Sequence, residues 1–269
     1  MIKVGFIGAG DIAYLHGEGV QASSNAQLHG IWNRTRTKAE EKASLFDTRV
    51  FDTAEELIEA VDVVYVLTNM ETHHAYCMQA IEAGKHVLVE KPTAVTIEEI
   101  EEIKAFAHQK GVQVAPVHNY IYEAPVMRAK ELIESGKLGD LVSLHVLYNI
   151  HHPEEVAARY PGVIRQILTH HAYCTLYLVG QPELVSCMKA TVNDGSVPQE
   201  NLAMVTMKMR NQALSHLCAS FAADDHAGDP WTFMIKVIGT KGATRYSYRD
   251  WVKNPPAVVH SQTYSAYPY

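Results

Sequence analysis

Lys91 is the residue of this 269-residue sequence whose type and position point most clearly to a chemical role. It follows the apolar run Lys85–Val89 and Glu90, and it directly precedes Pro92. A lysine at the carboxyl end of a buried strand lies where open α/β sheets bind their ligands. Its ammonium can hydrogen-bond a substrate oxygen and stabilise negative charge that develops there. A solvated surface lysine would not explain this place between a strand and a proline.

A glycine-rich turn, Gly8-Ala9-Gly10-Asp11-Ile12-Ala13, follows the first apolar run of the chain. A G-x-G-x-x-A pattern alone is a weak signal, but here a strand precedes it and a helix follows it, as in dinucleotide-binding folds. The glycines let the backbone approach a pyrophosphate, and the helix N-terminus offers N–H groups to it. The alternative is a tight turn without a ligand. We predict pyrophosphate contacts at Gly8, Gly10, Asp11 and Ile12.

The residues that follow the second predicted strand bear on the choice between NAD and NADP. An acidic residue there would bond the ribose 2′-hydroxyl and repel a 2′-phosphate, but this chain has Asn33 followed by Arg34. A guanidinium can hold a phosphate through two hydrogen bonds, so the pair favours NADP. The alternative is NAD, with Asn33 bonded to the ribose and Arg34 stacked on the adenine.

The first 119 residues alternate between strand and helix patterns, which is the arrangement needed to position these groups. Two helix starts, Thr53-x-x-Glu56 and Thr96-x-x-Glu99, fit the capping box. The alternation is typical of a doubly wound parallel sheet, so residues 1–119 are predicted to form a Rossmann domain that binds NAD(P). The predicted strands are Ile2–Ile7, Gln27–Trp32, Asp62–Leu67, Lys85–Val89 and Val112–Val117.

From residue 120 the pattern changes to strands with little helix between them. One helix is expected from Glu123 to Gly136 and another over Val163–Val179. Residues 120–269 are therefore predicted to form an α+β domain with a largely antiparallel open sheet, which binds substrate. An uncovered sheet face needs a partner, so we expect a homodimer or homotetramer through this sheet. The predicted strands are Leu141–Tyr148, Leu184–Val192, Leu202–Met209, Ala213–Phe221 and Thr232–Ile238.

Composition narrows the classes of function. A formal net charge of −7 without a cluster of Lys and Arg argues against a nucleic-acid partner. No apolar run reaches the length of a membrane span, and the N-terminus lacks the layout of a signal peptide, so a cytoplasmic protein is expected. The four cysteines stand far apart, without the spacing of a zinc or disulfide site. No metal is expected; the alternative is an ion held by His151, His152, His170 and His171.

The segment Glu82–Pro92, which reads EAGKHVLVEKP, closely resembles the signature of the Gfo/Idh/MocA (glucose–fructose oxidoreductase/inositol dehydrogenase) oxidoreductases. Thr68–His73 is similar to the family's T-P-x-x-x-H turn, with Asn69 in place of proline, and Gly239–Gly242 is similar to its G-T-x-G turn. The resemblance covers essentially the whole chain. It implies that Thr68, His73, Glu90 and Lys91 lie at the cofactor, that Lys91 also faces the substrate hydroxyl, and that the Lys91–Pro92 peptide bond is cis.

The family's second motif is D-x-x-x-H, in a helix of the second domain. Counting back from Leu178-Val179-Gly180, which resembles the end of that helix, places the histidine on His170 and puts Gln166 at the aspartate position. Glutamine can orient a group but cannot take a proton, whereas a histidine titrates near neutral pH. The resemblance therefore implies that His170 exchanges the proton. Tyr173 stands where the family often has an acidic residue. Predicted substrate contacts are Lys91, Asn119, Tyr120, Gln166, His170 and His171.

Two functions follow from these residues. The first is an NAD(P)-dependent oxidoreductase that interconverts a secondary alcohol and a ketone on a sugar, polyol or sugar derivative, with Lys91 polarising the oxygen and His170 exchanging the proton. The second is a non-catalytic dinucleotide-binding regulator of the same fold, which the glutamine at position 166 favours. Members of the family continue beyond the G-T-x-G turn, so the sequence is either a compact variant or part of a longer chain.

Overall fold

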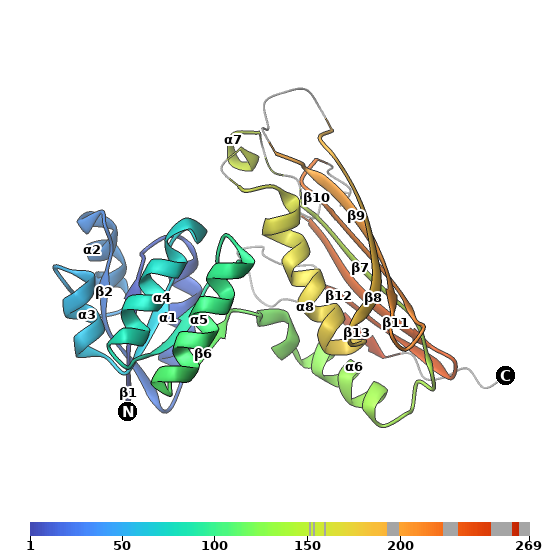
Figure 1. The fold of residues 1–269 in the computed structure, drawn as a ribbon, viewed down its shortest axis with the longest axis horizontal. Coiled ribbons are helices and arrows are strands. Elements are labelled where there is room, and N and C mark those ends of the chain that lie inside the picture. The colour runs from blue at the N-terminus through green and yellow to red at the C-terminus, as the bar shows by residue number, and fades with distance from the viewer. Residues whose placement is uncertain are drawn as a thin grey trace. The chain divides into compact units, whose positions relative to one another are not determined.

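The computed structural model describes residues 1–150, 152, 154–158, 160–192, 199–222, 231–248 and 260–263. The chain divides into two compact units, Met1–Val117 and His118–Tyr269. Each unit has its own sheet (Figure 1).

The first unit is a doubly wound sheet of six parallel strands in the order β3-β2-β1-β4-β5-β6. The order reverses beside β1, and ligands of such sheets bind at this switch point, at the carboxyl ends of the strands. The predicted Rossmann architecture is confirmed. The strands are β1 Ile2–Ile7, β2 Ala26–Trp32, β3 Arg49–Val50, β4 Val63–Val66, β5 His86–Val89 and β6 Val114–Pro116; the helices are α1 Ile12–Ala22, α2 Arg36–Leu45, α3 Ala54–Ala60, η1 Met70–Thr72, α4 His73–Glu82 and α5 Ile97–Lys110.

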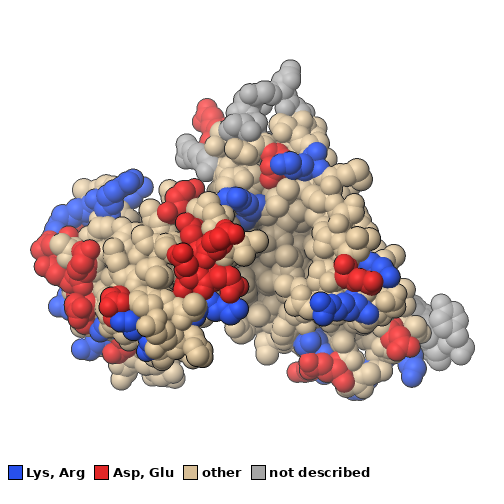
Figure 2. Space-filling view, viewed as in Figure 1, with Lys and Arg blue, Asp and Glu red and all other residues tan. Residues whose placement is uncertain are grey.

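Local signals explain where two of these helices begin. In α5 the Thr96 side chain accepts the Glu99 backbone N–H, and the Glu99 carboxylate bonds back to the Thr96 N–H, which completes the capping box. In α3 the Thr53 side chain accepts the Glu56 N–H, which is the first of the two bonds of this motif. The glutamates of α5 give this part of the first unit an acidic surface (Figure 2).

Among the described residues, the second unit is a mixed sheet in the order β13-β12-β11-β7-β10-β9-β8. Neighbouring strands are antiparallel except β7 and β10, so the predicted, largely antiparallel sheet is confirmed. The turn Gly239–Gly242 leads from β11 into β12, a strand that the sequence analysis did not predict. The elements are η2 Asn119–Tyr122, α6 Ala124–Glu134, β7 Leu141–Ile150, α7 Glu154–Ala157, η3 Ile164–Leu168, α8 Thr169–Leu178, β8 Pro182–Ala190, β9 Leu202–Met209, β10 Leu214–Ser220, β11 Trp231–Gly239, β12 Gly242–Tyr248 and β13 His260–Thr263.

The helix predicted over Val163–Val179 has two parts. Ile164–Leu168 is a π-helical stretch, and α8 begins only at Thr169. The stretch between Gln166 and His170 is partly π-helical, with i→i+5 bonds, so the two residues do not belong to one regular α-helix. Gln166 lies within the π stretch, whereas His170 lies in the first turn of α8.

His171 is an unusual part of the core of the second unit. Its ring is fully buried, 6.3 Å from the ring of Tyr148 between centroids, and neither ring nitrogen has a hydrogen-bond partner among the residues that the structure describes. Burial lowers the pKa of His171 to about 3. An unpartnered buried polar group opposes folding, so this histidine is held neutral at the expense of stability.

Replacing His171 with leucine should therefore raise stability, by about 1 kcal/mol or more near neutral pH. In the wild type the unfolded histidine has an ordinary pKa of 6.5 and the folded one a pKa of about 3. As the pH falls from 6.5 towards 3, His171 is protonated in the unfolded chain but stays neutral in the folded chain, so the free energy of unfolding falls. His171→Leu should reduce that drop, as measured by urea unfolding at about pH 7.5 and about pH 5.

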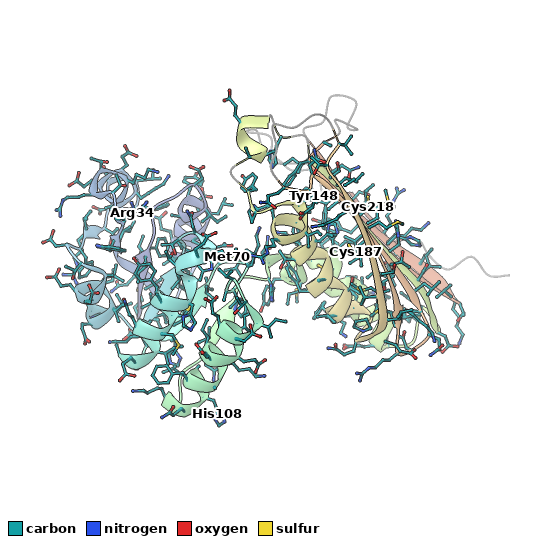
Figure 3. The ribbon with its side chains drawn as sticks, turned by 45° about the horizontal axis from the view of Figure 1, so that its top comes forward. Arg34, Met70, His108, Tyr148, Cys187 and Cys218 are labelled. Carbon is teal, nitrogen blue, oxygen red and sulfur yellow. The ribbon has the colours of Figure 1, made fainter. Side chains whose placement is uncertain are left out.

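The control is His108→Leu, a substitution of an exposed histidine in α5 (Figure 3). It should leave the pH dependence of unfolding unchanged. If His171→Leu and the wild type lost stability equally on acidification, His171 would not be the neutral core residue described above.

Candidate functional site

The loops after β1, β2 and β4 are joined by backbone hydrogen bonds around the glycine turn. The Gly8 N–H donates to the Trp32 carbonyl at 2.9 Å, and the Leu67 N–H donates to the Ile7 carbonyl at 2.8 Å. Gly8 has φ of 113°, and a Cβ there would lie 2.7 Å from the Leu67 carbonyl oxygen. Only glycine fits this close approach of two neighbouring chain segments.

Gly10 and the start of α1 leave the backbone open where a pyrophosphate would bind. A Cβ at Gly10 would meet no atom within 4 Å. Asp11 precedes α1, but its side chain makes no capping hydrogen bond. The Asp11 carboxylate therefore does not occupy the first N–H groups of the helix. These features fit a dinucleotide, because its pyrophosphate needs both close backbone approach and helix N–H donors.

Asn33 connects the end of β2 to the glycine turn. Its Oδ1 accepts the Ala9 N–H at 3.1 Å, and its Nδ2 donates to the Thr35 carbonyl at 2.9 Å. Arg34 is exposed at the same edge of the sheet (Figure 3). Burial and Glu55 raise the pKa of Tyr76, while the charge of Arg34 acts in the opposite direction. Arg34 therefore presents a solvated guanidinium whose charge acts on the Tyr76 hydroxyl.

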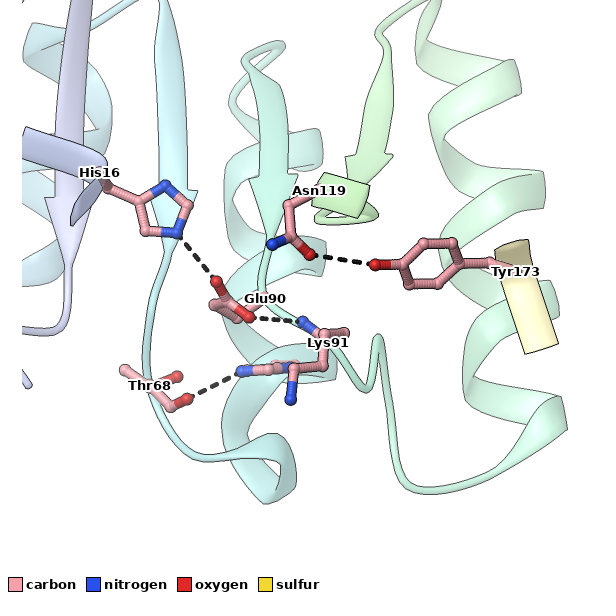
Figure 4. Close-up of polar contacts among 7 residues, drawn as sticks. His16, Thr68, Glu90, Lys91, Asn119 and Tyr173 are labelled. Atoms are coloured by element: carbon pink, nitrogen blue, oxygen red, sulfur yellow. Dashed lines mark hydrogen bonds and ion pairs between the residues drawn. The ribbon is translucent and has the colours of Figure 1, made fainter. Parts of the chain in front are cut away.

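Glu90 is the centre of a polar network after β5 (Figure 4). His16 Nε2 lies 2.9 Å from Glu90 Oε1, and the Lys91 backbone N–H donates to Glu90 Oε2 at 3.0 Å. Both carboxylate oxygens are therefore engaged, and Glu90 is only 8% exposed. His16 was not among the predicted site residues. A usable signal was present, because His16 lies close in helical position to the buried residues Ala13, Gly17 and Val20 of α1.

Lys91 is partly buried at the carboxyl end of β5, and the Lys91–Pro92 peptide bond is cis, as the resemblance implies. Burial lowers the pKa of the Lys91 ammonium, and the neighbouring Glu90 carboxylate partly offsets this by raising it. An ammonium with a lowered pKa is a better proton donor and a stronger hydrogen-bond donor to a developing alkoxide.

His73 links the loops that follow β4 and β5. One ring nitrogen lies 2.8 Å from the Pro92 carbonyl oxygen and the other lies 2.9 Å from the Thr68 carbonyl oxygen. The side chain is 1% exposed. The Thr68 hydroxyl accepts from the Thr72 hydroxyl at 2.7 Å. The structure thus gives His73 a role in fixing two loops at the edge of the sheet.

In the second unit, His170 belongs to a cluster of polar and aromatic groups in which His170, Tyr120 and Tyr173 are buried and Asn119 is exposed. His170 Nδ1 lies 2.7 Å from the Tyr173 hydroxyl. The Tyr173 hydroxyl donates to Asn119 Oδ1 at 3.0 Å (Figure 4). It accepts the Tyr120 N–H at 3.2 Å. Three of the predicted substrate residues therefore come together around Tyr173, whose hydroxyl was not predicted to bond His170.

The other predicted substrate residues lie differently. Gln166 is half-buried in the π stretch. His171 is completely buried in the core of its own unit, which argues against contact with a substrate. Sequence spacing could not separate the two adjacent histidines, because a shift of one helical position decides which ring points inward.

Within the described part of the chain, no group of three or more His, Cys, Asp or Glu residues could hold a metal ion. His151, one of the four histidines considered above, lies outside the described residues. In the same part of the chain, no helix is long and apolar enough to cross a membrane.

Comparison with known proteins defines the class of the chain. Residues 2–118 match the model of an oxidoreductase family with an NAD-binding Rossmann fold. Residues 126–245 match the model of the GFO/IDH/MocA C-terminal domain. The chain belongs to the Gfo/Idh/MocA family of oxidoreductases.

Individual relatives extend this result. Glucose-6-phosphate 3-dehydrogenase of Bacillus subtilis is 26% identical over 263 residues, which cover 91% of this chain and 74% of that protein. The scyllo-inositol 2-dehydrogenase (NADP(+)) IolW of the same organism is 34% identical over 195 residues, 69% of this chain and 54% of that protein. The match thus spans about half the length of the second relative.

Solved structures show the same fold. The WlbA dehydrogenase from Bordetella pertussis, in complex with NADH and UDP-GlcNAcA, superposes with a TM-score of 0.83 at 22% identity, covering 91% of this chain and 73% of that one.

Gly10→Asp should abolish dinucleotide binding without unfolding the protein. The new side chain meets open space in the protein, but its carboxylate would occupy and repel the position of the pyrophosphate. Juxtaposed like charges are costly, so we expect affinity for NAD and NADP to fall by roughly a hundredfold or more in calorimetric titrations.

The matched control is Gly19→Asp in α1, the helix that follows the glycine turn, where a Cβ also meets no described atom within 4 Å. It should bind dinucleotide like the wild type. Equal affinity of the Gly10→Asp variant and the wild type would place the pyrophosphate elsewhere.

Proposed function

We propose that the chain catalyses the NAD(P)-dependent interconversion of a secondary alcohol and a ketone on a sugar, polyol or sugar derivative. Lys91 carries this proposal: a partly buried ammonium with a lowered pKa stands at the carboxyl end of β5, next to the engaged carboxylate of Glu90. The names of the two Bacillus subtilis relatives, a sugar-phosphate dehydrogenase and an inositol dehydrogenase, support this class of substrate.

In the proposed reaction Lys91 donates a hydrogen bond to the oxygen of the reacting carbon and His170 accepts the hydroxyl proton during oxidation. The bound nicotinamide supplies the hydride acceptor for oxidation and the hydride donor for reduction. Gly8, Gly10, Asp11 and Ile12 would hold its pyrophosphate, while Thr68, His73 and Glu90 keep the neighbouring loops in place. Asn119, Tyr120 and Gln166 are the proposed substrate contacts, with His171 left out because it is buried.

We propose NADP as the preferred cofactor. The two residues after β2 are the neutral Asn33, whose Oδ1 is bonded to the Ala9 N–H, and the exposed Arg34. An exposed guanidinium at that position suits a 2′-phosphate. The name of IolW includes NADP(+), which supports the same choice. Calorimetric titration of the wild type with NAD and with NADP tests this preference. Equal affinities for the two dinucleotides would mean that Arg34 does not bind the 2′-phosphate.

Lys91→Met and His170→Ala should each lower kcat while dinucleotide affinity is retained. For His170→Ala we expect a fall of roughly 10²–10⁴-fold, the usual contribution of a positioned acid or base. The nicotinamide absorbance, followed over a panel of sugars, polyols, sugar phosphates and nucleotide sugars, measures turnover. The control is Lys104→Met in α5, where the lysine side chain is 74% exposed.

Full activity in both variants would contradict the assigned roles. Tight dinucleotide binding without turnover of any substrate in the panel would instead favour the non-catalytic regulator, the function that Gln166 in the position of the motif's aspartate supports.

We also propose that a second copy of the chain covers the open face of the second sheet. Side chains alternate between the two faces of a strand, and the paired residues of neighbouring strands share a face. One row of this face is apolar across five strands, and its Met188 and Met204 are 77% and 42% exposed. The row is Met188, Met204, Cys218, Leu147 and Met234 (Cys218 in Figure 3).

Met204→Glu should therefore weaken the assembly, because it places a charge in the middle of the apolar row. Light scattering at micromolar concentration should show an oligomer for the wild type and a smaller species for the variant. Met127→Glu, at a 45% exposed methionine of α6, is the matched control and should assemble normally. A monomeric wild type would remove the proposed interface.

A further inference from the structure

We propose that Tyr173 is a positioning residue that holds His170 in the tautomer with its proton on Nδ1. A neutral phenol here does the work for which a carboxylate is otherwise used. The catalytic consequence rests on the proposed function, since it requires His170 to accept the substrate proton. The tautomer itself does not depend on that function.

The Tyr173 hydroxyl is surrounded by three polar atoms of its own unit. They are His170 Nδ1 at 2.7 Å, Asn119 Oδ1 at 3.0 Å and the Tyr120 backbone nitrogen at 3.2 Å. Tyr173 and His170 are both only 8% exposed. A phenol offers one hydrogen and two lone pairs, so these three contacts use its full hydrogen-bonding capacity.

The direction of each hydrogen bond follows from the partners. The Tyr120 N–H can only donate, so it uses one lone pair of the phenol oxygen. Asn119 Oδ1 can only accept, so the phenolic hydrogen points to it. The remaining lone pair then faces His170 Nδ1, which must donate. Neutral His170 therefore carries its proton on Nδ1, and its basic lone pair is on Nε2.

Ring contacts keep this arrangement in place. The His118 ring lies 4.3 Å from the Tyr173 ring between centroids, tilted by 32°. The Tyr120 ring meets His170 edge-on at 4.9 Å and stacks on Phe233 at 4.6 Å. The short segment from His118 to Tyr120 thus contacts both partners of the histidine–tyrosine pair. It supplies the backbone donor, the amide acceptor and two of the packing rings.

A phenol and a carboxylate differ in charge. Both accept the Nδ1–H of an imidazole and fix the ring, but a phenol does not ionise near neutral pH and adds no negative charge to a buried cluster. His170 is therefore oriented for proton transfer at Nε2 by a group that carries no charge of its own near neutral pH. The consequence is a specific dependence on the Tyr173 hydroxyl and on the acceptor at position 119.

Tyr173→Phe tests the hydroxyl. We expect kcat to fall roughly ten- to hundredfold, the range for loss of a hydrogen bond to a group that becomes charged, with KM and dinucleotide affinity little changed. In nitrogen-15 NMR of the histidine rings, His170 should lose its single Nδ1–H form and become a mixture of tautomers. The control is Tyr177→Phe, in the same helix, whose ring lies under Lys130 and should affect neither readout.

Asn119 provides a second test that does not depend on the stability of the Tyr173 variant. In Asn119→Leu the phenolic hydrogen loses its acceptor and should turn to His170 Nδ1, which moves the histidine proton to Nε2. In Asn119→Asp the acceptor is kept, so the proton should stay on Nδ1. Both spectra are recorded without substrate.

A wild-type His170 protonated on Nε2, or the same tautomer in both Asn119 variants, would overturn the proposal. The expected tautomers together with unchanged kcat in Tyr173→Phe would overturn its catalytic part. The expected tautomers with no turnover of any substrate by the wild type would instead count against the proposed function, while the role of Tyr173 in holding the ring would stand.

Discussion

The first unit depends on the close approach of the backbone at Gly8 to the carbonyl of Leu67. A side chain at this point would lie 2.7 Å from that oxygen, so the ends of β1 and β4 could not keep their present distance. Three hydrogen bonds depend on this spacing. The Gly8 N–H donates to the Trp32 carbonyl, and the Ala9 N–H donates to Asn33 Oδ1. The loop after β4 also carries the carbonyl that the His73 ring contacts. Because no larger residue fits at position 8, this glycine sets the spacing of the loops that we assign to the dinucleotide.

Sequence patterns predicted the parts of the protein that depend on neighbouring residues. The glycine turn, the Thr96 capping box and most strands belong to this group, because their signals span only a few positions. The contacts of His16 with Glu90 and of Tyr173 with Asn119 join residues 74 and 54 positions apart. Such contacts depend on rotamers and on packing between elements, so no local pattern encodes them. Short β3 carried too few residues for a period to be seen.

The helix that carries His170 begins with a π stretch that its sequence does not reveal. A turn closed by i→i+5 bonds holds an additional residue, so positions across Ile164–Leu168 do not follow the spacing of a regular α-helix. The count from Leu178 back to His170 and the three-residue spacing from His170 to Tyr173 both lie within α8, so both stay valid. The ring of the adjacent His171 is buried in the core of the same unit.

The polar groups around Lys91 and those around His170 differ in how they tolerate burial. At Lys91 a buried carboxylate is tolerated because both oxygens of Glu90 have donors and an ammonium is close by. Around His170, the atoms bonded to Tyr173 are a ring nitrogen, an amide oxygen and a backbone nitrogen, so the phenol makes its three hydrogen bonds without a carboxylate. A buried carboxylate in place of the phenol would need its own donors or a cation. In the proposed reaction, proton transfer to His170 would therefore create charge in a cluster whose orienting group is neutral, and the strength of that base would depend on the geometry of the Tyr173 hydroxyl.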